Sequence, residues 1–130
     1  MTTDLWMLVA SGLLGAALPL VYLTGRVATP GGLVWAFGNR ETPLDVKPWV
    51  MRAVRAHNNL TENIALFAIL VLVAHVTGKA NATTALGAEL FFYGRVAHIA
   101  LYTAGAVYLR TAAYFVGVAG EILILFQLLK

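Results

Sequence analysis

The chain has 130 residues, of which 60% are hydrophobic and only 12% are charged, and its mean hydropathy is +0.79. A soluble domain carries about 25% charged residues, and one this small could not bury so much apolar surface, so membrane insertion is expected. The net charge of +3 comes from scattered basic residues without a basic run, which argues against nucleic-acid binding. The absence of cysteine excludes disulfides, a thiolate nucleophile and cysteine metal sites, so thiol chemistry would need a thiol from outside.

The first predicted element is a transmembrane helix over residues 5–24. A membrane-spanning helix needs about 20 apolar residues, and the run from Leu5 to Leu23 supplies them. This segment has no basic region at its start and is long for a signal peptide, so we expect it to be retained as the first span.

The connection that follows, RVATPGGLVWAFGNRETPLDVKP, is too long to be a simple turn between packed helices. Loops of this length are uncommon and are often functional. Its prolines and glycines argue against a regular helix, whereas Trp35 and Phe37 suit the membrane interface.

The second span is predicted over residues 48–77. Only the run from Ile64 to Val76 is cleanly apolar, and at about 1.5 Å per residue it extends roughly 20 Å, less than the ~30 Å of a hydrocarbon core. We therefore expect the helix to begin at Pro48, since proline suits the first turn. It would then carry part of the polar segment RAVRAHNNLTEN, residues 52–63, into the membrane.

Two further spans are predicted over residues 80–109 and 111–129. The sequence thus predicts one all-α domain over residues 1–130, a bundle of four transmembrane helices. Basic residues concentrate between the first two spans, which makes that side cytoplasmic and puts both termini on the opposite side. Arg110, expected in the third connection, falls on the cytoplasmic side as well.

Polar residues of the second span share one side of the predicted helix. Arg52, Arg55, Asn59 and Glu62 follow a 3–4–3 spacing, and Asn58 flanks them. Such residues cannot face lipid, because a charged side chain at the bilayer centre costs at least ~2.5–3.5 kcal/mol. An alternative is a self-contained polar seam in which Arg55 pairs with Glu62, but this accounts for only two of the residues.

The third and fourth spans carry matching polar positions. In GRVAHIALY and LRTAAY, side chains recur one turn apart on one side of each helix. With antiparallel spans these positions lie at one depth, near the cytoplasmic side. The residues are Arg95, His98, Tyr102, Arg110, Thr111 and Tyr114.

The residue types indicate the ligand. Arginines bind carboxylates or phosphates, a glutamate among them binds an ammonium group, and asparagines complement amides. Arginine and tyrosine together stabilise an anion such as a thiolate. A short acidic peptide-like molecule fits this set. Two lone carboxylates, Glu89 and Glu121, fit inter-subunit hydrogen bonding, with a proton relay as the alternative.

The ordered motifs RAVRAHNNLTEN, GRVAHIALY and LRTAAY resemble the MAPEG family, the membrane-associated proteins of eicosanoid and glutathione metabolism. The resemblance covers nearly the whole chain and is closest to the short bacterial members. It implies a four-helix transmembrane homotrimer, here expected in a bacterial inner membrane, with glutathione bound between neighbouring subunits at the cytoplasmic side. No metal is implied.

The resemblance also assigns roles to individual residues. It implies that Arg110 stabilises the glutathione thiolate, and that Arg52 and Arg95 belong to a polar network between helices. Two positions depart from the family pattern: Ala28 stands where family members that use glutathione carry a basic residue, and Asn58 replaces an arginine found in the prostaglandin-synthase type. The implied glutathione contacts are Arg55, Asn58, Asn59, Glu62, His98, Tyr102, Thr111 and Tyr114.

The expected function is that of a glutathione-dependent transferase or peroxidase acting on lipophilic electrophiles or lipid hydroperoxides. The thiol would come from glutathione as co-substrate, and the lipophilic substrate would arrive from the bilayer. One alternative is a non-catalytic trimeric scaffold that keeps the polar core for assembly. Another is a proton- or solute-conducting bundle that uses Glu89 and Glu121.

Overall fold

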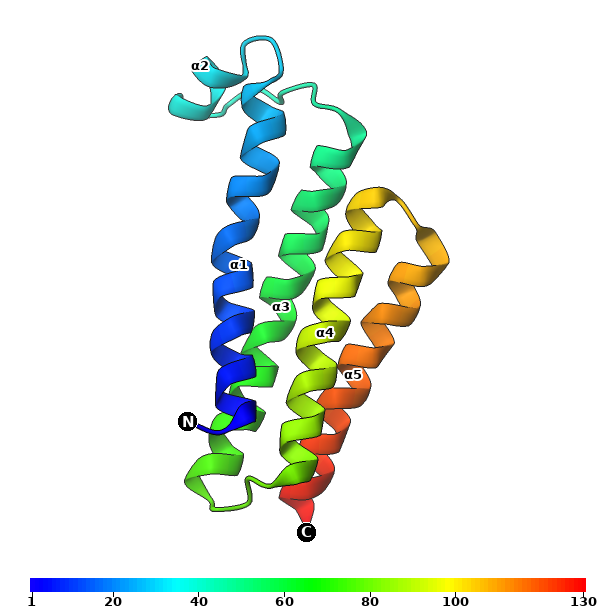
Figure 1. Ribbon diagram of the computed structural model, residues 1–130. Helices are drawn as coiled ribbons and strands as arrows, with labels where there is room; N and C mark the ends of the chain where they lie inside the picture. The colour runs from blue at the N-terminus through cyan, green and yellow to red at the C-terminus, as the bar shows by residue number, and fades with distance from the viewer.

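The computed structural model describes residues 1–130 as an all-helical protein without strands. Four long helices run alternately up and down, and a short helix lies at the end where the first two long helices are connected (Figure 1). Both termini lie at the opposite end. The helices are α1 (Thr3–Val27), α2 (Gly32–Phe37), α3 (Pro48–Val76), α4 (Ala82–Ala104) and α5 (Val107–Leu129).

Three of the helices, α1, α3 and α5, are long and apolar enough to cross a membrane. The fourth long helix, α4, matches α5 in length at 23 residues, but it contains Glu89, Arg95 and His98, which make it more polar. All four long helices are therefore similar in length, but α4 is more polar than the three helices that are apolar enough to cross a membrane.

The polar segment of residues 52–63 is helical throughout, as predicted. The α3 helix begins at Pro48, which occupies the first turn, and continues for 29 residues to Val76. In its first half the buried side is made of small and branched side chains, including Val50, Ala53 and Ala56, and α1 and α4 pack against α3. The polar residues are thereby carried on a regular helix and keep the spacing that the sequence predicts.

The boundary between the last two helices differs from the prediction of spans over 80–109 and 111–129. The α4 helix ends at Ala104 and α5 begins at Val107. Gly105 ends α4 by adopting a left-handed conformation, with φ of 92°, that is open to glycine and costly for other residues. Arg110 therefore lies in the first turn of α5, and its expected place in the connection is wrong.

Helices α4 and α5 pack closely because glycines face each other. A methyl group on Gly94 would lie 2.8 Å from the backbone nitrogen of Gly117, and one on Gly87 would lie 2.6 Å from the carbonyl oxygen of Gly120. Neither position leaves room for a side chain. This contact fixes how the polar residues of α4 face those of α5.

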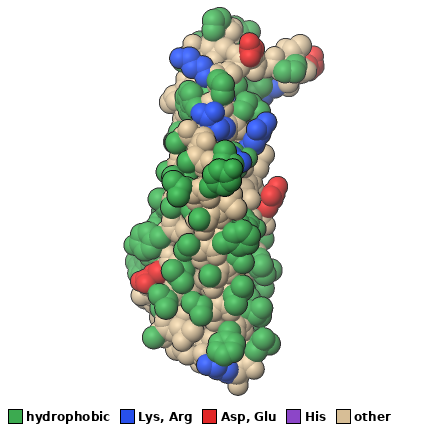
Figure 2. Space-filling view, turned by 90° about the vertical axis from the view of Figure 1, so that its right-hand side faces the viewer, with side chains coloured by type: hydrophobic (Ala, Val, Ile, Leu, Met, Phe, Trp, Pro, Cys, Tyr) green, Lys and Arg blue, Asp and Glu red, His purple; other side chains and the backbone are tan.

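The two ends of the bundle differ in their polar contacts. At the end with the termini, buried Asp4 lies 3.0 Å from Nε2 of His75 and accepts a hydrogen bond from the hydroxyl of Thr84, so α1, α3 and α4 are joined there. At the other end, basic side chains gather near α2, above a face that is mostly hydrophobic with isolated acidic side chains (Figure 2).

Candidate functional site

Four side chains of α4 and α5 form a cluster, here called the Arg110 cluster: His98, Tyr102, Arg110 and Tyr114. The guanidinium carbon of Arg110 lies 4.1 Å from the centre of the Tyr102 ring. His98 Nδ1 lies 2.8 Å from the Arg110 carbonyl oxygen, and its ring is 5.5 Å from that of Tyr102 and 5.9 Å from that of Tyr114. The cluster joins the end of α4 to the start of α5.

The hydrogen bond from His98 defines the proton position on this residue. A carbonyl oxygen only accepts, so Nδ1 carries a proton and donates it to the Arg110 carbonyl. The bond holds the first turn of α5 against α4. The guanidinium of Arg110 lies over the Tyr102 ring and makes no hydrogen bond or ion pair within the chain. Its N–H groups are thus free to bind an anion.

Arg95 lies deeper between α3, α4 and α5 and is 1% exposed. Its NH1 group donates to Oδ1 of Asn59 over 3.0 Å, and its guanidinium carbon lies 4.6 Å from the Tyr114 ring centre. Gly117 makes room for the guanidinium, because a methyl group there would lie 3.3 Å from Nε of Arg95. Arg95 and Asn59 therefore connect three helices inside one chain.

Glu121 follows Gly117 by one turn on the same side of α5 and is also buried. Buried side-chain polar atoms without a hydrogen-bond partner occur at only three residues: Arg95 (Nε and NH2), His98 (Nε2) and Glu121 (Oε1). Buried polar groups are normally paired, and unpaired ones in a native structure often belong to functional sites. The buried polar atoms without a hydrogen-bond partner therefore lie between α4 and α5, beneath Arg110.

Arg52 has a different environment from Arg110. Its Nε donates to the carbonyl oxygen of Thr103 over 2.9 Å, and its guanidinium lies beside Gly105, where α4 ends. Carbonyl groups in the last turn of a helix have no partner within the helix, so Arg52 satisfies one of them from α3. This contact ties α3 to the end of α4.

The other predicted site residues point outward. Arg55, Asn58 and Glu62 are exposed on α3, and their side chains make no hydrogen bond or ion pair within the chain. The pairing of Arg55 with Glu62, which the polar-seam alternative requires, is absent, because Asp4 and His75 form the only ion pair. Thr111 is exposed as well, and its hydroxyl donates to the Val107 carbonyl.

Within one chain, the predicted site residues thus lie in two separate groups. Asn59, Arg95 and the Arg110 cluster lie between helices, whereas Arg55, Asn58 and Glu62 lie on an outer surface. None of the three main cavities is lined by a residue of either group. A single chain does not enclose a pocket that joins them.

The outer surface of α3 has a regular pattern that was not recognised in the sequence. Its exposed residues follow one another at alternating intervals of three and four positions. Those near α2 are polar, and those toward the other end of α3 are apolar. This spacing is typical of a helix that contacts another helix. It was hidden because almost every position in the second half of α3 is apolar. The residues of this exposed face of α3 are Arg55, Asn58, Glu62, Ala65, Ile69, Leu72 and Val76.

A second group of aromatic and basic residues near α2 was also missed. The hydroxyl of Tyr22 lies 3.2 Å from Nδ1 of His57, which turns away from the exposed face of α3 toward α1. Arg26 stacks on the Tyr22 ring with 4.8 Å between its guanidinium carbon and the ring centre. These residues lie far apart in the sequence, and no motif there joins them.

Comparison with known sequences agrees with the motifs of these helices. The model of the MAPEG family matches residues 5–130, essentially the whole chain. A search among curated proteins gave no match.

Proposed function

Because the chain belongs to the MAPEG family, we propose that it is a membrane-embedded, glutathione-dependent enzyme of the transferase or peroxidase type. The family uses glutathione, and it includes such transferases and peroxidases as well as non-catalytic members. The substrates are lipophilic electrophiles or lipid hydroperoxides that reach the site from the bilayer. The apolar helices support an integral membrane location.

This proposal rests on the surroundings of the Arg110 side chain. Its guanidinium is held against Tyr102 and has no acceptor within the chain, while His98 holds the backbone that carries it. A cation beside a thiol favours the charged form of that thiol and so lowers its pKa. Arg110 therefore raises the fraction of glutathione that is present as the nucleophilic thiolate.

Glutathione recognition is assigned to both groups of polar residues. Arg55 binds a carboxylate of the peptide, Glu62 binds its ammonium group, and the amides of Asn58 and Asn59 pair with its backbone. His98, Tyr102, Thr111 and Tyr114 line the thiol end near Arg110. Because Arg55, Asn58 and Glu62 face outward, the full site requires a neighbouring copy of the chain.

The proposed assembly is a homotrimer in which the exposed face of α3 contacts a neighbouring copy. All four long helices cross the membrane, a bacterial inner membrane, and α4 does so with its polar side covered by α3 and α5. The end with α2 lies on the cytoplasmic side, and both termini lie on the other side, as the distribution of basic residues favours.

Activity of the purified protein tests the role of Arg110. Wild type and Arg110→Ala are assayed in detergent with glutathione and either a chlorinated aromatic compound or a lipid hydroperoxide. Loss of a guanidinium that stabilises developing negative charge costs roughly 100-fold in kcat. The control Lys130→Ala, at the far end of the molecule, keeps wild-type rates. Equal rates for wild type and Arg110→Ala would remove this mechanism.

A non-catalytic scaffold is the second candidate. The contacts of Arg52 with Thr103 and of Arg95 with Asn59 favour it, because they serve helix packing without any ligand. In that case glutathione leaves the melting temperature unchanged, and replacing Arg52 or Glu62 disperses the oligomer. Glutathione-dependent thermal stabilisation that is lost in Arg55→Ala would exclude the scaffold and support the enzyme.

A further inference from the structure

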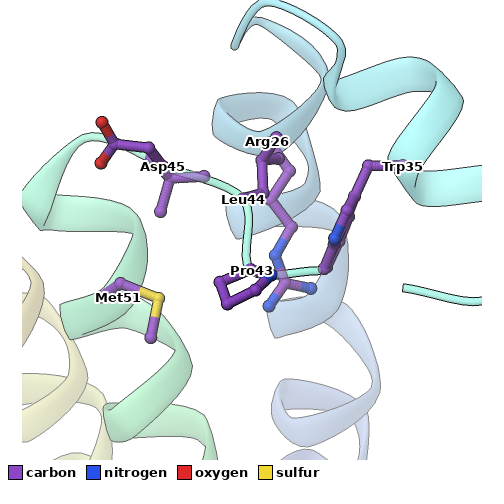
Figure 3. A pocket seen from close by; sticks show the side chains of 7 residues that line it. Arg26, Trp35, Pro43, Leu44, Asp45 and Met51 are labelled. Atoms are coloured by element: carbon purple, nitrogen blue, oxygen red, sulfur yellow. The ribbon is translucent and has the colours of Figure 1, made fainter. Parts of the chain in front are cut away.

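A cavity of about 390 Å³ lies between the end of α1, the start of α3 and the segment that connects α2 to α3 (Figure 3). Its volume is within the range of small-ligand sites. One cationic and one acidic residue line it together with apolar and aromatic ones. The lining residues are Arg26, Trp35, Pro43, Leu44, Asp45, Val46 and Met51.

The cationic group of this cavity is held by aromatic rings. The guanidinium carbon of Arg26 lies 4.8 Å from the Tyr22 ring centre and 5.1 Å from the Trp35 ring centre. The Trp35 ring is itself fixed, because its Nε1 donates to the carbonyl oxygen of Thr42 over 2.7 Å. The side chain of Arg26 makes no hydrogen bond or ion pair within the chain, so its donors are available to a ligand.

The charges around the cavity favour an anion. The guanidinium of Arg26 points toward Trp35 and Pro43, whereas the carboxylate of Asp45 points away from it (Figure 3). Arg40 lies on the same indole, with its guanidinium carbon 5.3 Å from the Trp35 ring centre. Two guanidinium groups beside one indole make the Trp35 side of the cavity unfavourable for an ammonium group.

The cavity lies at the depth of lipid headgroups. Arg26 is in the last turn of α1, which begins at Thr3, so the two are roughly 35 Å apart along the helix, slightly more than the ~30 Å hydrocarbon core. Nearby α2 exposes Leu33, Val34 and Phe37, and the Phe37 side chain is 88% exposed. Exposed apolar residues on a short helix at this depth are suited to the boundary between headgroups and acyl chains.

We propose that this cavity binds the phosphodiester headgroup of an anionic phospholipid. The fork of the Arg26 guanidinium matches two phosphate oxygens. Leu44, Val46 and Met51 contact the glycerol backbone and the first carbons of the acyl chains. Two guanidinium groups at Trp35, with the Asp45 carboxylate directed away from Arg26, discriminate against zwitterionic lipids, whose ammonium group would find no partner there. This site is independent of the proposed glutathione chemistry at Arg110.

Lipid retention measured by native mass spectrometry tests the site without glutathione. The purified protein is titrated in neutral detergent with phosphatidylglycerol or phosphatidylcholine of equal acyl chains. Wild type should bind phosphatidylglycerol at least about tenfold more tightly, as expected for one charge-assisted pair, and Arg26→Gln should lose this preference. The matched control Lys130→Gln removes one positive charge at the opposite end and should keep the preference.

Two further experiments distinguish a lipid from a soluble ligand. Leu44→Gln should weaken phosphatidylglycerol binding, because it removes an apolar contact but leaves Arg26 in place. Free glycerol phosphate should fail to displace the lipid at equal concentration. Displacement by glycerol phosphate would overturn the lipid assignment in favour of a soluble phosphate. Displacement by glutathione would overturn it too, because it would mean that the cavity binds glutathione.

The variants need a check on folding. Arg26→Lys keeps the charge but loses the planar fork, so it should retain an intermediate preference for the anionic lipid. Circular dichroism should give wild-type helix content for all variants. Equal retention of phosphatidylglycerol by wild type and a folded Arg26→Gln would overturn the proposal.

Discussion

At the scale of single residues, two arginines of neighbouring helices have different surroundings. Arg95 is enclosed, donates to Asn59 and stacks on Tyr114, so its guanidinium stabilises the packing of the helices. The guanidinium of Arg110 lies over the ring of Tyr102 and makes no hydrogen bond within the chain. A guanidinium has five donors in a fixed fork. Those of Arg110 are all unengaged on a half-buried side chain, whereas the unpaired Nε and NH2 of Arg95 are enclosed between helices, so Arg110 is the residue available for an anionic ligand. Substitution of the two arginines should therefore affect different measurements.

Arg95→Ala should lower the free energy of unfolding by about 2–4 kcal/mol, since it leaves a cavity and an unpaired Asn59 amide between helices. The exposed Arg40, replaced by alanine, should change it by no more than about 0.5 kcal/mol. Chemical unfolding in detergent measures both. The double variant with Asn59→Ala should cost less than the two single changes added together. Strict additivity would mean that the two residues do not depend on each other.

At the scale of secondary-structure elements, the contact between α4 and α5 determines the Arg110 cluster. The two helices approach so closely that a methyl group on Gly87, Gly94 or Gly120 would meet the backbone of the facing helix. Close approach of this kind is how helices associate in membranes, where the hydrophobic effect does not drive them together. It also sets the register that brings His98 to the carbonyl of Arg110.

Gly94→Ala should destabilise the protein by about 1–3 kcal/mol, because the added methyl group meets the backbone of α5 at Gly117. Gly12, in α1, is the matched control, since nothing lies within 4 Å of a methyl group there. Gly12→Ala should be neutral or stabilise by up to about 1 kcal/mol through higher helix propensity. Thermal unfolding in detergent compares the two variants. Equal effects would contradict the packing described for α4 and α5.

At the scale of the whole molecule, the chain leaves one polar surface without partners. The exposed face of α3 carries Arg55, Asn58 and Glu62 near α2 and continues into apolar residues toward the other end. Unpaired charged groups within a membrane helix are costly, so this face is expected to meet protein and not lipid. The proposed trimer places this face against a neighbouring copy and would complete the glutathione site there.

The absence of cysteine allows a direct test of that contact. A single Ile69→Cys on the exposed face of α3 should form disulfide-linked species between copies under mild oxidation. A disulfide requires Cα atoms within about 7 Å, so a single introduced cysteine links two copies only where the same position of both copies lies close together. Leu13→Cys, equally apolar and exposed on α1, is the control and should remain a single chain on non-reducing gels. Absence of linked species from Ile69→Cys would argue against a contact between the α3 helices of neighbouring copies.

The sequence by itself determined the all-helical fold, the start of α3 at Pro48 and the family. Apolar run length, proline and helical spacing are local properties, and each restricts the backbone within a few residues. The end of α4 was missed because a left-handed glycine within an apolar run gives only a weak signal, and Arg110 was consequently assigned to a connection instead of a helix.

Only the tertiary structure decided which side of each helix meets a neighbour. Helical spacing places Arg55 and Asn59 on one side of α3, yet the packing of α4 covers Asn59 and leaves Arg55 exposed. The cavity at Arg26 likewise depends on the path of the segment between α2 and α3. The physical reason is that periodicity fixes angles around one helix axis, whereas the facing of two helices depends on contacts between residues that are distant in the sequence.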